Sequence, residues 1–230
     1  MRKWLFVCLG CLLILQGCAD AGTNVGHETE GTNMNRLLLQ AVDRRDADAV
    51  AKLVQEGADV NAQDAKGRTP AMIATYNNDP ATVQALIDAG ADVNIQDEIR
   101  NTPFLYAGAE GYLEIVKLTI QAGADPAITN RFGGTALIPA SEHGYTDVVQ
   151  ELLANTNVDV NHINNLGWTA LMEAIILNDG GPKQQQTVKL LLDHGADANI
   201  PDHDGVTPLQ HARDKGYTEI ERLLLEAGAK

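Results

Sequence analysis

Histidine, cysteine and glycine-rich segments are the features of this chain that could supply a metal site, a nucleophile or a phosphate loop. The histidines are His27, His143, His162, His194, His203 and His211. Their spacing forms neither a His-Glu-x-x-His motif nor a Cys-x-x-Cys-containing set, the patterns typical of zinc sites. Gly133-Gly134 and Gly180-Gly181 lack the Lys-Ser or Lys-Thr of a phosphate loop. We therefore expect no enzyme, no cofactor and no metal.

The first residues have the organisation of a secretory signal. Arg2 and Lys3 precede an apolar run from Trp4 to Leu15. A run of about 12 apolar residues is short for a bilayer-spanning helix, which needs about 20. We therefore predict that residues 1–17 are a signal peptide rather than a membrane span.

Cys18 follows this run directly. The sequence Leu15-Gln16-Gly17-Cys18 resembles the lipoprotein box of bacteria, although Gln16 departs from the usual small or weakly apolar residue. Cleavage would leave Cys18 as the only cysteine, which excludes an intramolecular disulfide and fits lipid attachment. In this family Ala19, rather than Asp, implies an outer-membrane anchor facing the periplasm. The alternative is an ordinary cleaved signal without lipid.

Residues 18–34 have little apolar content and no helical period, so we predict a flexible tether between the lipid and a folded body. The net charge of −14 becomes −16 when Arg2 and Lys3 leave with the signal. A chain this acidic, with no basic stripe, is unsuited to nucleic acid. We expect a monomer that meets the membrane only through Cys18.

The remainder of the chain repeats itself. Thr-Pro or Thr-Ala pairs begin at 69, 102, 135, 169 and 207, separated by 33, 33, 34 and 38 residues. Gly-Ala-Asp recurs at 57, 90 and 123, and again at 195, with an apolar helical pattern before each copy. A fixed period of this length indicates a stack of similar units.

These motifs resemble the ankyrin repeat, and Asp204 to Ala212, with its Thr-Pro-Leu-Gln-His-Ala core, is the best copy. The resemblance covers residues 35–230 in about six copies. It implies an all-α repeat solenoid of stacked helix-turn-helix units with projecting hairpin tips. The charged first copy and the polar last copy fit capping repeats, so we expect a complete array.

The signature residues also have physical roles. Each Thr can cap a helix, and Pro suits the next position because its missing N–H has no partner there. Each glycine after an apolar run ends a helix in the left-handed region. The carboxylates that recur in every repeat are expected to stabilise turns rather than to act as acids or bases.

Three departures stand out. Asn78 replaces a loop glycine, and Pro139 removes a backbone donor one turn into a helix. The third is an insertion at 178–182, expected to project from the helical edge of the stack. It is either a neutral insertion or a binding loop.

In ankyrin proteins, recognition falls on the hairpin tips and on the first helices, which line a concave face. Carried over by position, the partner-binding candidates are Lys66, Arg68, Tyr76, Ile99, Arg131, Phe132, Leu166, Trp168 and His203. The neighbouring candidates are Glu98, Asn101, Glu110, Glu142, Asn165 and Asp204. Aromatic residues and Arg are enriched in interface hot spots, which favours Arg131, Phe132 and Trp168. Trp168 is either such an anchor or a ring packed on its own hairpin.

The predicted function is therefore a protein-interaction scaffold, or protective binding module, tethered to the bacterial envelope. An alternative is an immunity-type inhibitor that plugs the active site of an exported enzyme. A hydrolase is a distant third interpretation. The motifs name no partner protein, because surface side chains specify the recognition.

Overall fold

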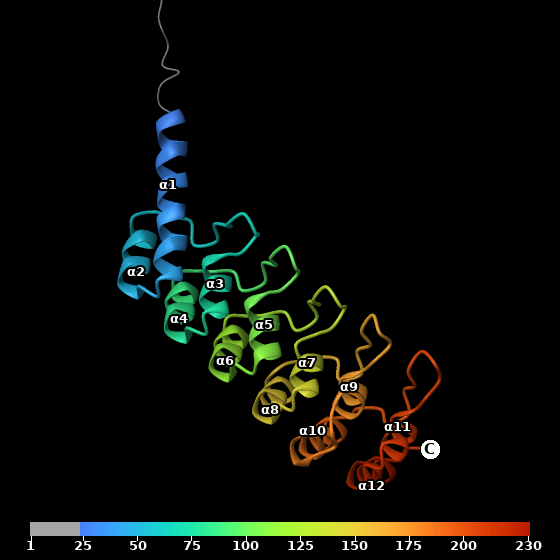
Figure 1. Ribbon diagram of the computed structural model, residues 1–230. Helices are drawn as coiled ribbons and strands as arrows, with labels where there is room; N and C mark the ends of the chain where they lie inside the picture. Colours follow the sequence, from blue (N-terminus) through green and yellow to red (C-terminus); the bar gives the residue numbers. More distant parts are fainter. Residues whose placement is uncertain (1–23) are drawn as a thin grey trace, which may run out of the picture.

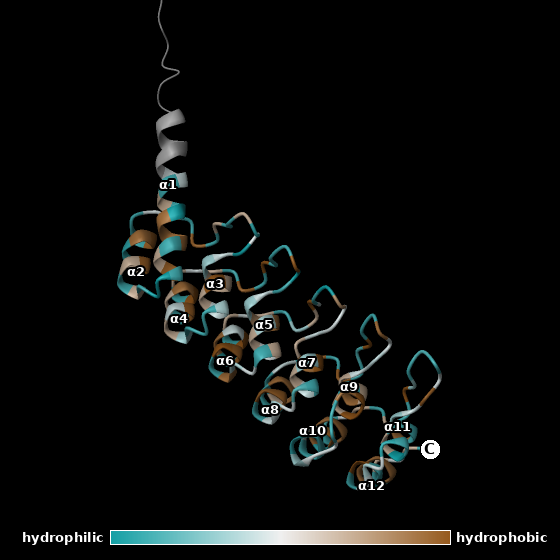
Figure 2. Ribbon diagram, in the orientation of Figure 1, coloured by the Kyte–Doolittle hydropathy of each residue, from teal (hydrophilic) through white to brown (hydrophobic). Residues whose placement is uncertain are grey.

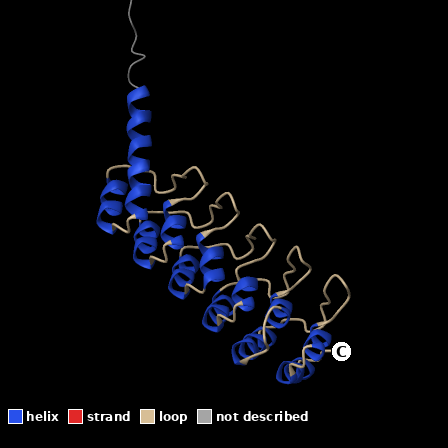
Figure 3. Cartoon of the chain, viewed as in Figure 1, coloured by secondary structure: helices blue, strands red, loops and turns tan. Residues whose placement is uncertain are grey.

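The computed structural model describes residues 24–230, with side chains from residue 31 onward. The predicted signal peptide 1–17, the lipidation site Cys18 and the start of the tether lie outside this range. Six helix pairs succeed one another as layers of a stack, and a hairpin projects from each junction between pairs (Figure 1). Over residues 24–230 there are helices and loops but no strands (Figure 3). The predicted all-α repeat solenoid is confirmed.

The inner helices carry odd numbers and the outer helices even ones. Their bounds are α1 Asn24–Asp43, α2 Ala47–Gln55, α3 Pro70–Tyr76, α4 Pro80–Asp88, α5 Pro103–Glu110, α6 Leu113–Gln121, α7 Leu137–Glu142, α8 Thr146–Asn155, α9 Ala170–Ile176, α10 Pro182–Asp193, α11 Pro208–Asp214 and α12 Thr218–Glu226. None of these twelve is both long enough and apolar enough to cross a membrane.

The tether prediction needs a correction, because α1 begins at Asn24 and residues 24–34 are therefore helical rather than coil. The residues of this segment are poor helix formers. However, adding a turn to an existing helix avoids the cost of nucleation. The packed part of α1, with Leu38 and Val42 fully buried, supplies that nucleus.

A continuous apolar core runs through the stack, from Leu38 in α1 to Leu224 in α12. Each layer contributes small and aliphatic side chains, and the largest fully buried one is Phe104. Hydrophobic residues gather on the helices, whereas the hairpins are largely hydrophilic (Figure 2). Each layer therefore buries its apolar surface only against its neighbours, as stacked repeats do.

Four of the five predicted threonine caps are present. The hydroxyls of Thr69, Thr102, Thr169 and Thr207 each accept the N–H three residues ahead, at 3.1 to 3.3 Å. Thr135 is the exception, since α7 starts after Ala136 and the Thr135 hydroxyl is buried without a partner. Pro139 explains the difference. It has no N–H to bond the Thr135 carbonyl, and the first turn tightens to a bond from Ile138 N–H.

One side-chain oxygen holds each hairpin. Asp64 Oδ1 accepts the N–H of Lys66 at 2.8 Å and of Arg68 at 2.9 Å. The same bonds to the second and fourth residues ahead recur at Asp97, Asn130, Asn164 and Asp202. The carboxylates at these positions are thus structural. The Asp after each Gly-Ala, which was predicted to stabilise a turn, also does so, since Asp92 accepts the Asn94 N–H at 2.8 Å.

A ladder of asparagines links successive layers. Asn61 Oδ1 accepts the Asp92 N–H, and Asn94 Oδ1 accepts the Asp125 N–H. Asn35, Asn161 and Asn199 make the equivalent bond. Ala127 occupies this position in the next layer, so the Asp159 N–H receives no such acceptor. A cleft of about 540 Å³ lies at this junction, between the end of α6 and the end of α8.

The insertion at 178–182 does not project as expected. Asn178 Nδ2 donates to the Glu142 carbonyl at 2.7 Å, and the Tyr217 hydroxyl donates to the Asn178 carbonyl. Gly180, at φ +71°, lies so close to the Tyr217 ring that a Cβ there would approach within 2.6 Å. The remaining extra residues lengthen α10 to 12 residues, against 9 in α4 and α12. The insertion therefore ties three layers together.

The asparagine ladder predicts opposite effects of two substitutions. Asn94→Ala removes the acceptor of a backbone N–H and should lower the free energy of unfolding by about 1 kcal/mol. Ala127→Asn supplies the missing acceptor and should raise it by up to about 1 kcal/mol. Urea denaturation measures both changes. Asn155→Ala, whose side chain bonds only Glu151 on its own helix, is the control and should stay within about 0.5 kcal/mol of wild type. A loss of stability in Ala127→Asn would contradict the interpretation of the gap.

Candidate binding face

Five hairpin tips project to the same side of the stack, beyond the inner helices (Figure 1). The third residue of each tip is, in order, Lys66, Ile99, Phe132, Leu166 and Asp204. The middle three are exposed apolar side chains, at 37% for Ile99, 57% for Phe132 and 55% for Leu166. We call these five residues, with Arg68, Arg100 and Arg131 beside them, the tip ridge. Its centre offers apolar contact area that the fold leaves uncovered.

Backbone bonds hold neighbouring tips together in pairs. The Glu98 N–H donates to the Lys66 carbonyl, and the Asn165 N–H donates to the Phe132 carbonyl, both at 3.0 Å. A Cβ at Gly133 would lie 2.4 Å from Asn165 Oδ1, which shows how closely those two tips approach. Because each tip is also fixed internally by its Asp or Asn, the ridge is a pre-organised surface.

The cations of the ridge differ in their partners. Arg68 forms an ion pair with Asp64, at 2.6 Å from its terminal nitrogen. Arg131 lies over the ring of Phe132, 4.7 Å from its centroid, and this contact orients both side chains. Within residues 31–230, Lys66, Arg100 and Arg131 have no ion-pair partner. These three charges are available to another molecule.

Four of the predicted site residues line one cleft. Lys66, Arg68, Tyr76 and Ile99 surround about 280 Å³ between the first two complete tips. Tyr76 is fixed there, because its hydroxyl donates to Asp97 Oδ2 at 2.6 Å and its ring packs 4.3 Å from that of Tyr106. Burial raises the pKa of Tyr76 to about 12. Tyr76 thus shapes the cleft wall.

Trp168 and His203 lie at the fourth and fifth tips. The Trp168 side chain is half-buried, and its backbone N–H is held by Asn164 Oδ1 at 3.1 Å. His203 packs on the preceding tip, where a Cβ at Gly167 would lie 2.3 Å from the imidazole. Trp168 is therefore only partly available to another molecule.

The inner helices carry a feature that the motif analysis missed. Glu173 in α9 is only 5% exposed, and its Oε1 accepts the Asn164 amide at 2.6 Å. Burial, followed by the nearby negative charge of Glu142, raises the pKa of Glu173 to about 7. The repeat pattern contained a signal that could have identified Glu173. The corresponding residues are Ile73, Tyr106, Pro139 and His211, so Glu173 is the one carboxyl at this position of the five repeats.

The other candidates are spread over the same side. Asn101 donates to the Tyr76 hydroxyl at 3.4 Å and is half-buried. Glu98, Glu110, Asn165 and Asp204 are exposed, and Glu142 is half-buried beside α9. The candidates thus share one surface made of the tip ridge and the inner helices, with an acidic character on the helices.

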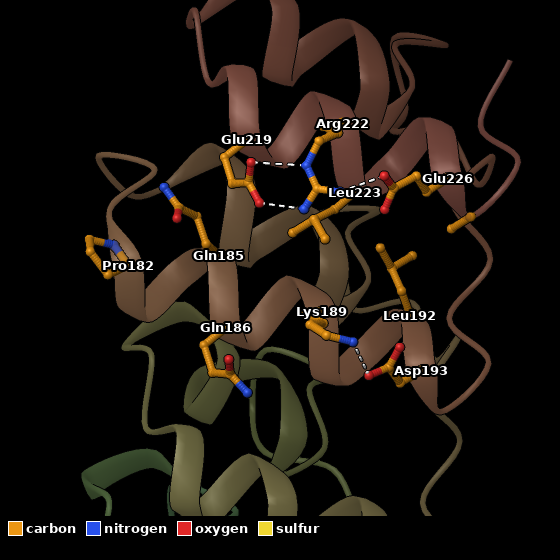
Figure 4. A pocket seen from close by; sticks show the side chains of 11 residues that line it. Pro182, Gln185, Gln186, Lys189, Leu192, Asp193, Glu219, Arg222, Leu223 and Glu226 are labelled. Atoms are coloured by element: carbon orange, nitrogen blue, oxygen red, sulfur yellow. Dashed lines mark hydrogen bonds and ion pairs between the residues drawn. The ribbon is translucent and has the colours of Figure 1, made fainter.

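A larger cleft, of about 600 Å³, lies away from this surface, between outer helices α10 and α12 (Figure 4). Its charged residues already pair with one another. Arg222 bonds both Glu219 and Glu226, and Lys189 bonds Asp193 at 2.7 Å. Across residues 24–230, histidine, cysteine and carboxylate side chains form no group suited to a metal ion. This cleft follows from the lengthened α10 rather than from a reactive cluster.

Comparison with known proteins gives consistent results. The family model for ankyrin repeats in three copies matches residues 9–97, 37–130, 104–202 and 180–230. A solved ankyrin repeat domain from Acinetobacter baumannii AYE is 52% identical, with a TM-score of 0.82, over 84% of this chain and 98% of that one. The solved ankyrin domain of Bcl-3, a member of the IkappaB family, is 26% identical, with a TM-score of 0.76, over 84% and 86% of the two chains.

Among curated proteins, the ankyrin repeat protein YahD of Escherichia coli K12 is 57% identical over 81 residues, which is 35% of this chain and 40% of YahD. The match therefore spans less than half of the length of this relative. The similar proteins are ankyrin-repeat proteins, and the family model that matches the chain is not that of a catalytic family.

Glu173 predicts a pH-dependent stability. Its pKa rises from an ordinary value of 4.5 to about 7 on folding, so the folded state favours the protonated form. The stability from this group is complete below about pH 4.5 and is lost as the pH rises through 7. Glu173→Gln keeps an acceptor for Asn164 without the charge. It should therefore exceed wild type by roughly 3 kcal/mol at high pH and match it at low pH.

Denaturant unfolding of wild type and variant at several pH values measures this difference. Glu110→Gln is the control, because it removes an exposed carboxylate from α5. A stability difference for Glu173→Gln that did not change with pH would show that folding leaves the pKa of Glu173 unchanged, and would contradict the raised value.

Proposed function

Because the chain belongs to the ankyrin-repeat family, we propose that it is a non-catalytic module that holds a protein partner on its tip ridge and inner helices. Ankyrin repeats are protein–protein interaction modules, and the similar proteins share this architecture. The observation that carries the proposal is the exposed apolar series Ile99, Phe132 and Leu166 on three consecutive tips, each of which is hydrogen-bonded through its backbone to one neighbouring tip. Apolar side chains on a rigid surface, rimmed by charges, are typical of an interface centre.

The second part of the proposal is attachment to the bacterial envelope through Cys18. Its support is the signal-like start of the sequence and the resemblance of residues 15–18 to a lipoprotein box. The direction of α1 is compatible with it, since the amino end of α1 extends on the side to which the tips point (Figure 1). In this arrangement the module is held near the outer membrane, in the periplasm, and works there as a scaffold or protective binder.

Two tip substitutions test the binding role. Phe132→Ala and Leu166→Ala should each weaken the complex by roughly 2 kcal/mol, because interface anchors lose buried contact area. Their effect on unfolding should be within about 0.5 kcal/mol, since both side chains are exposed. Gentle crosslinking in the native cell, followed by quantification of the captured protein, measures the loss.

Leu225→Ala is the matched control, because Leu225 is 46% exposed on α12, away from the tips. Equal capture by all three variants would contradict the proposed face. The inhibitor interpretation gains support only if the captured protein is an enzyme whose activity disappears in the complex. Capture of a fully active protein favours the scaffold.

Cys18→Ser tests the anchor. Without a thiol at this position no lipid can be attached, so we expect the variant to remain unprocessed or to lose its partition into detergent. Intact mass and detergent-phase partition measure the outcome. If wild type and variant behaved alike in both measurements, the lipid anchor would be wrong, whereas the binding role of the repeats would be unaffected.

A further inference from the structure

The tip ridge is the cationic part of an acidic molecule. The chain has a net charge of −14, and between residues 53 and 182 it contains five Lys or Arg residues. Four of these lie on the tip ridge, namely Lys66, Arg68, Arg100 and Arg131, and only Lys117 lies elsewhere. Positive charge in the middle of the stack is therefore concentrated where the apolar side chains are exposed.

The acidic groups of these tips are mostly engaged. Asp64 accepts two backbone N–H groups and pairs with Arg68. Asp97 is buried and accepts two backbone N–H groups together with the Tyr76 hydroxyl. Glu98 is the exposed carboxylate that remains. Lys66, Arg100 and Arg131 thus outnumber the free negative charge on the three tips from 64 to 134.

The inner helices beside the ridge have the opposite character. Glu110 ends α5, Glu142 ends α7, and Glu173 lies in α9. An acidic ligand would be repelled from these helices and attracted to the tips, over a distance of about 8–10 Å at physiological salt. These charges favour an acidic ligand that contacts the tip ridge and avoids the inner helices.

The repeat sets the spacing of the ridge. Ile99, Phe132 and Leu166 occupy the same position of consecutive tips, and stacked helical layers lie about 8–10 Å apart. An extended chain in the polyproline II conformation advances about 3.1 Å per residue and has three residues per turn, so every third side chain faces the same side. One tip therefore corresponds to about three residues of an extended ligand.

We propose that the tip ridge binds an extended acidic segment of a partner protein, with an apolar residue at about every third position. The apolar residues lie on Ile99, Phe132 and Leu166, and the carboxylates between them pair with Lys66, Arg100 and Arg131. This inference rests on the proposed function and specifies the partner segment.

Selection from a displayed library of random peptides on the purified protein tests the proposal directly. The enriched peptides should carry net negative charge and apolar residues at a spacing of about three. A synthetic copy of one enriched peptide should bind Arg131→Gln or Phe132→Ala about tenfold more weakly. Raising the salt concentration should also weaken binding. Lys117→Gln and Leu225→Ala, both away from the ridge, should leave the affinity unchanged.

The proposal would be overturned by a neutral or basic consensus peptide, by the absence of any enrichment, or by equal affinity for the ridge variants and the controls. Binding of vesicles that contain phosphatidylglycerol, lost in Arg131→Gln and Phe132→Ala, without peptide enrichment, would assign the ridge to a membrane surface instead. If cellular capture of a partner depends on Phe132 but peptide selection fails, the proposal of an extended acidic ligand is wrong, whereas the proposed function stands. Failure of that capture removes the proposed function itself.

Discussion

The hydrogen bonds from one side chain at the head of each hairpin determine where the exposed residues of this protein lie. At Asp64, Asp97, Asn130, Asn164 and Asp202, a single oxygen accepts the N–H groups two and four residues ahead. Each pair of bonds closes the tip into one shape. Because the first of those two N–H groups belongs to the third residue of the tip, the same bonds that satisfy the backbone also fix the position of the ridge residues.

The second polar atom of that side chain joins the tip to the helices. Asp97 Oδ2 accepts the Tyr76 hydroxyl of the preceding layer, Asn164 Nδ2 donates to Glu173, and Asp202 Oδ2 bonds His211 at 2.7 Å. Tip geometry therefore depends on side chains of the inner helices. In the Asn164 repeat that partner is the buried carboxyl of Glu173, whose pKa is raised by burial.

The helix boundaries could be predicted because Thr and Gly act locally. A threonine cap needs only the next three residues, and each left-handed glycine directly follows an apolar helical run. The stack of helices could therefore be predicted from the sequence. The interactions between layers could not be predicted in this way. Pro139 disables the Thr135 cap through a missing backbone donor, and the insertion packs because Tyr217, 39 residues from Asn178, reaches its carbonyl. The ridge residues other than Arg100 were predicted by position, but their exposure and pairing, and the place of Arg100 among them, required the fold.

Arg100 occupies a tip position at which a residue with a side chain costs conformational free energy. Four tips place Gly67, Gly133, Gly167 and Gly205 at the left-handed position, whereas the second tip places Arg100 there, at φ 64°. A side chain in this region costs about 1–2 kcal/mol relative to glycine.

Arg45 is also left-handed, but its guanidinium donates to the Asn77 carbonyl and so stabilises the fold. The Arg100 guanidinium has no hydrogen-bond or ion-pair partner within residues 31–230. The backbone of Arg100 is held within the tip, because its N–H donates to the Asp97 carbonyl at 2.9 Å and its carbonyl accepts the Gln96 amide at 2.7 Å. The left-handed conformation is therefore imposed by the hairpin, and the guanidinium is left to face a negatively charged group of another molecule along the ridge, between Ile99 and Phe132.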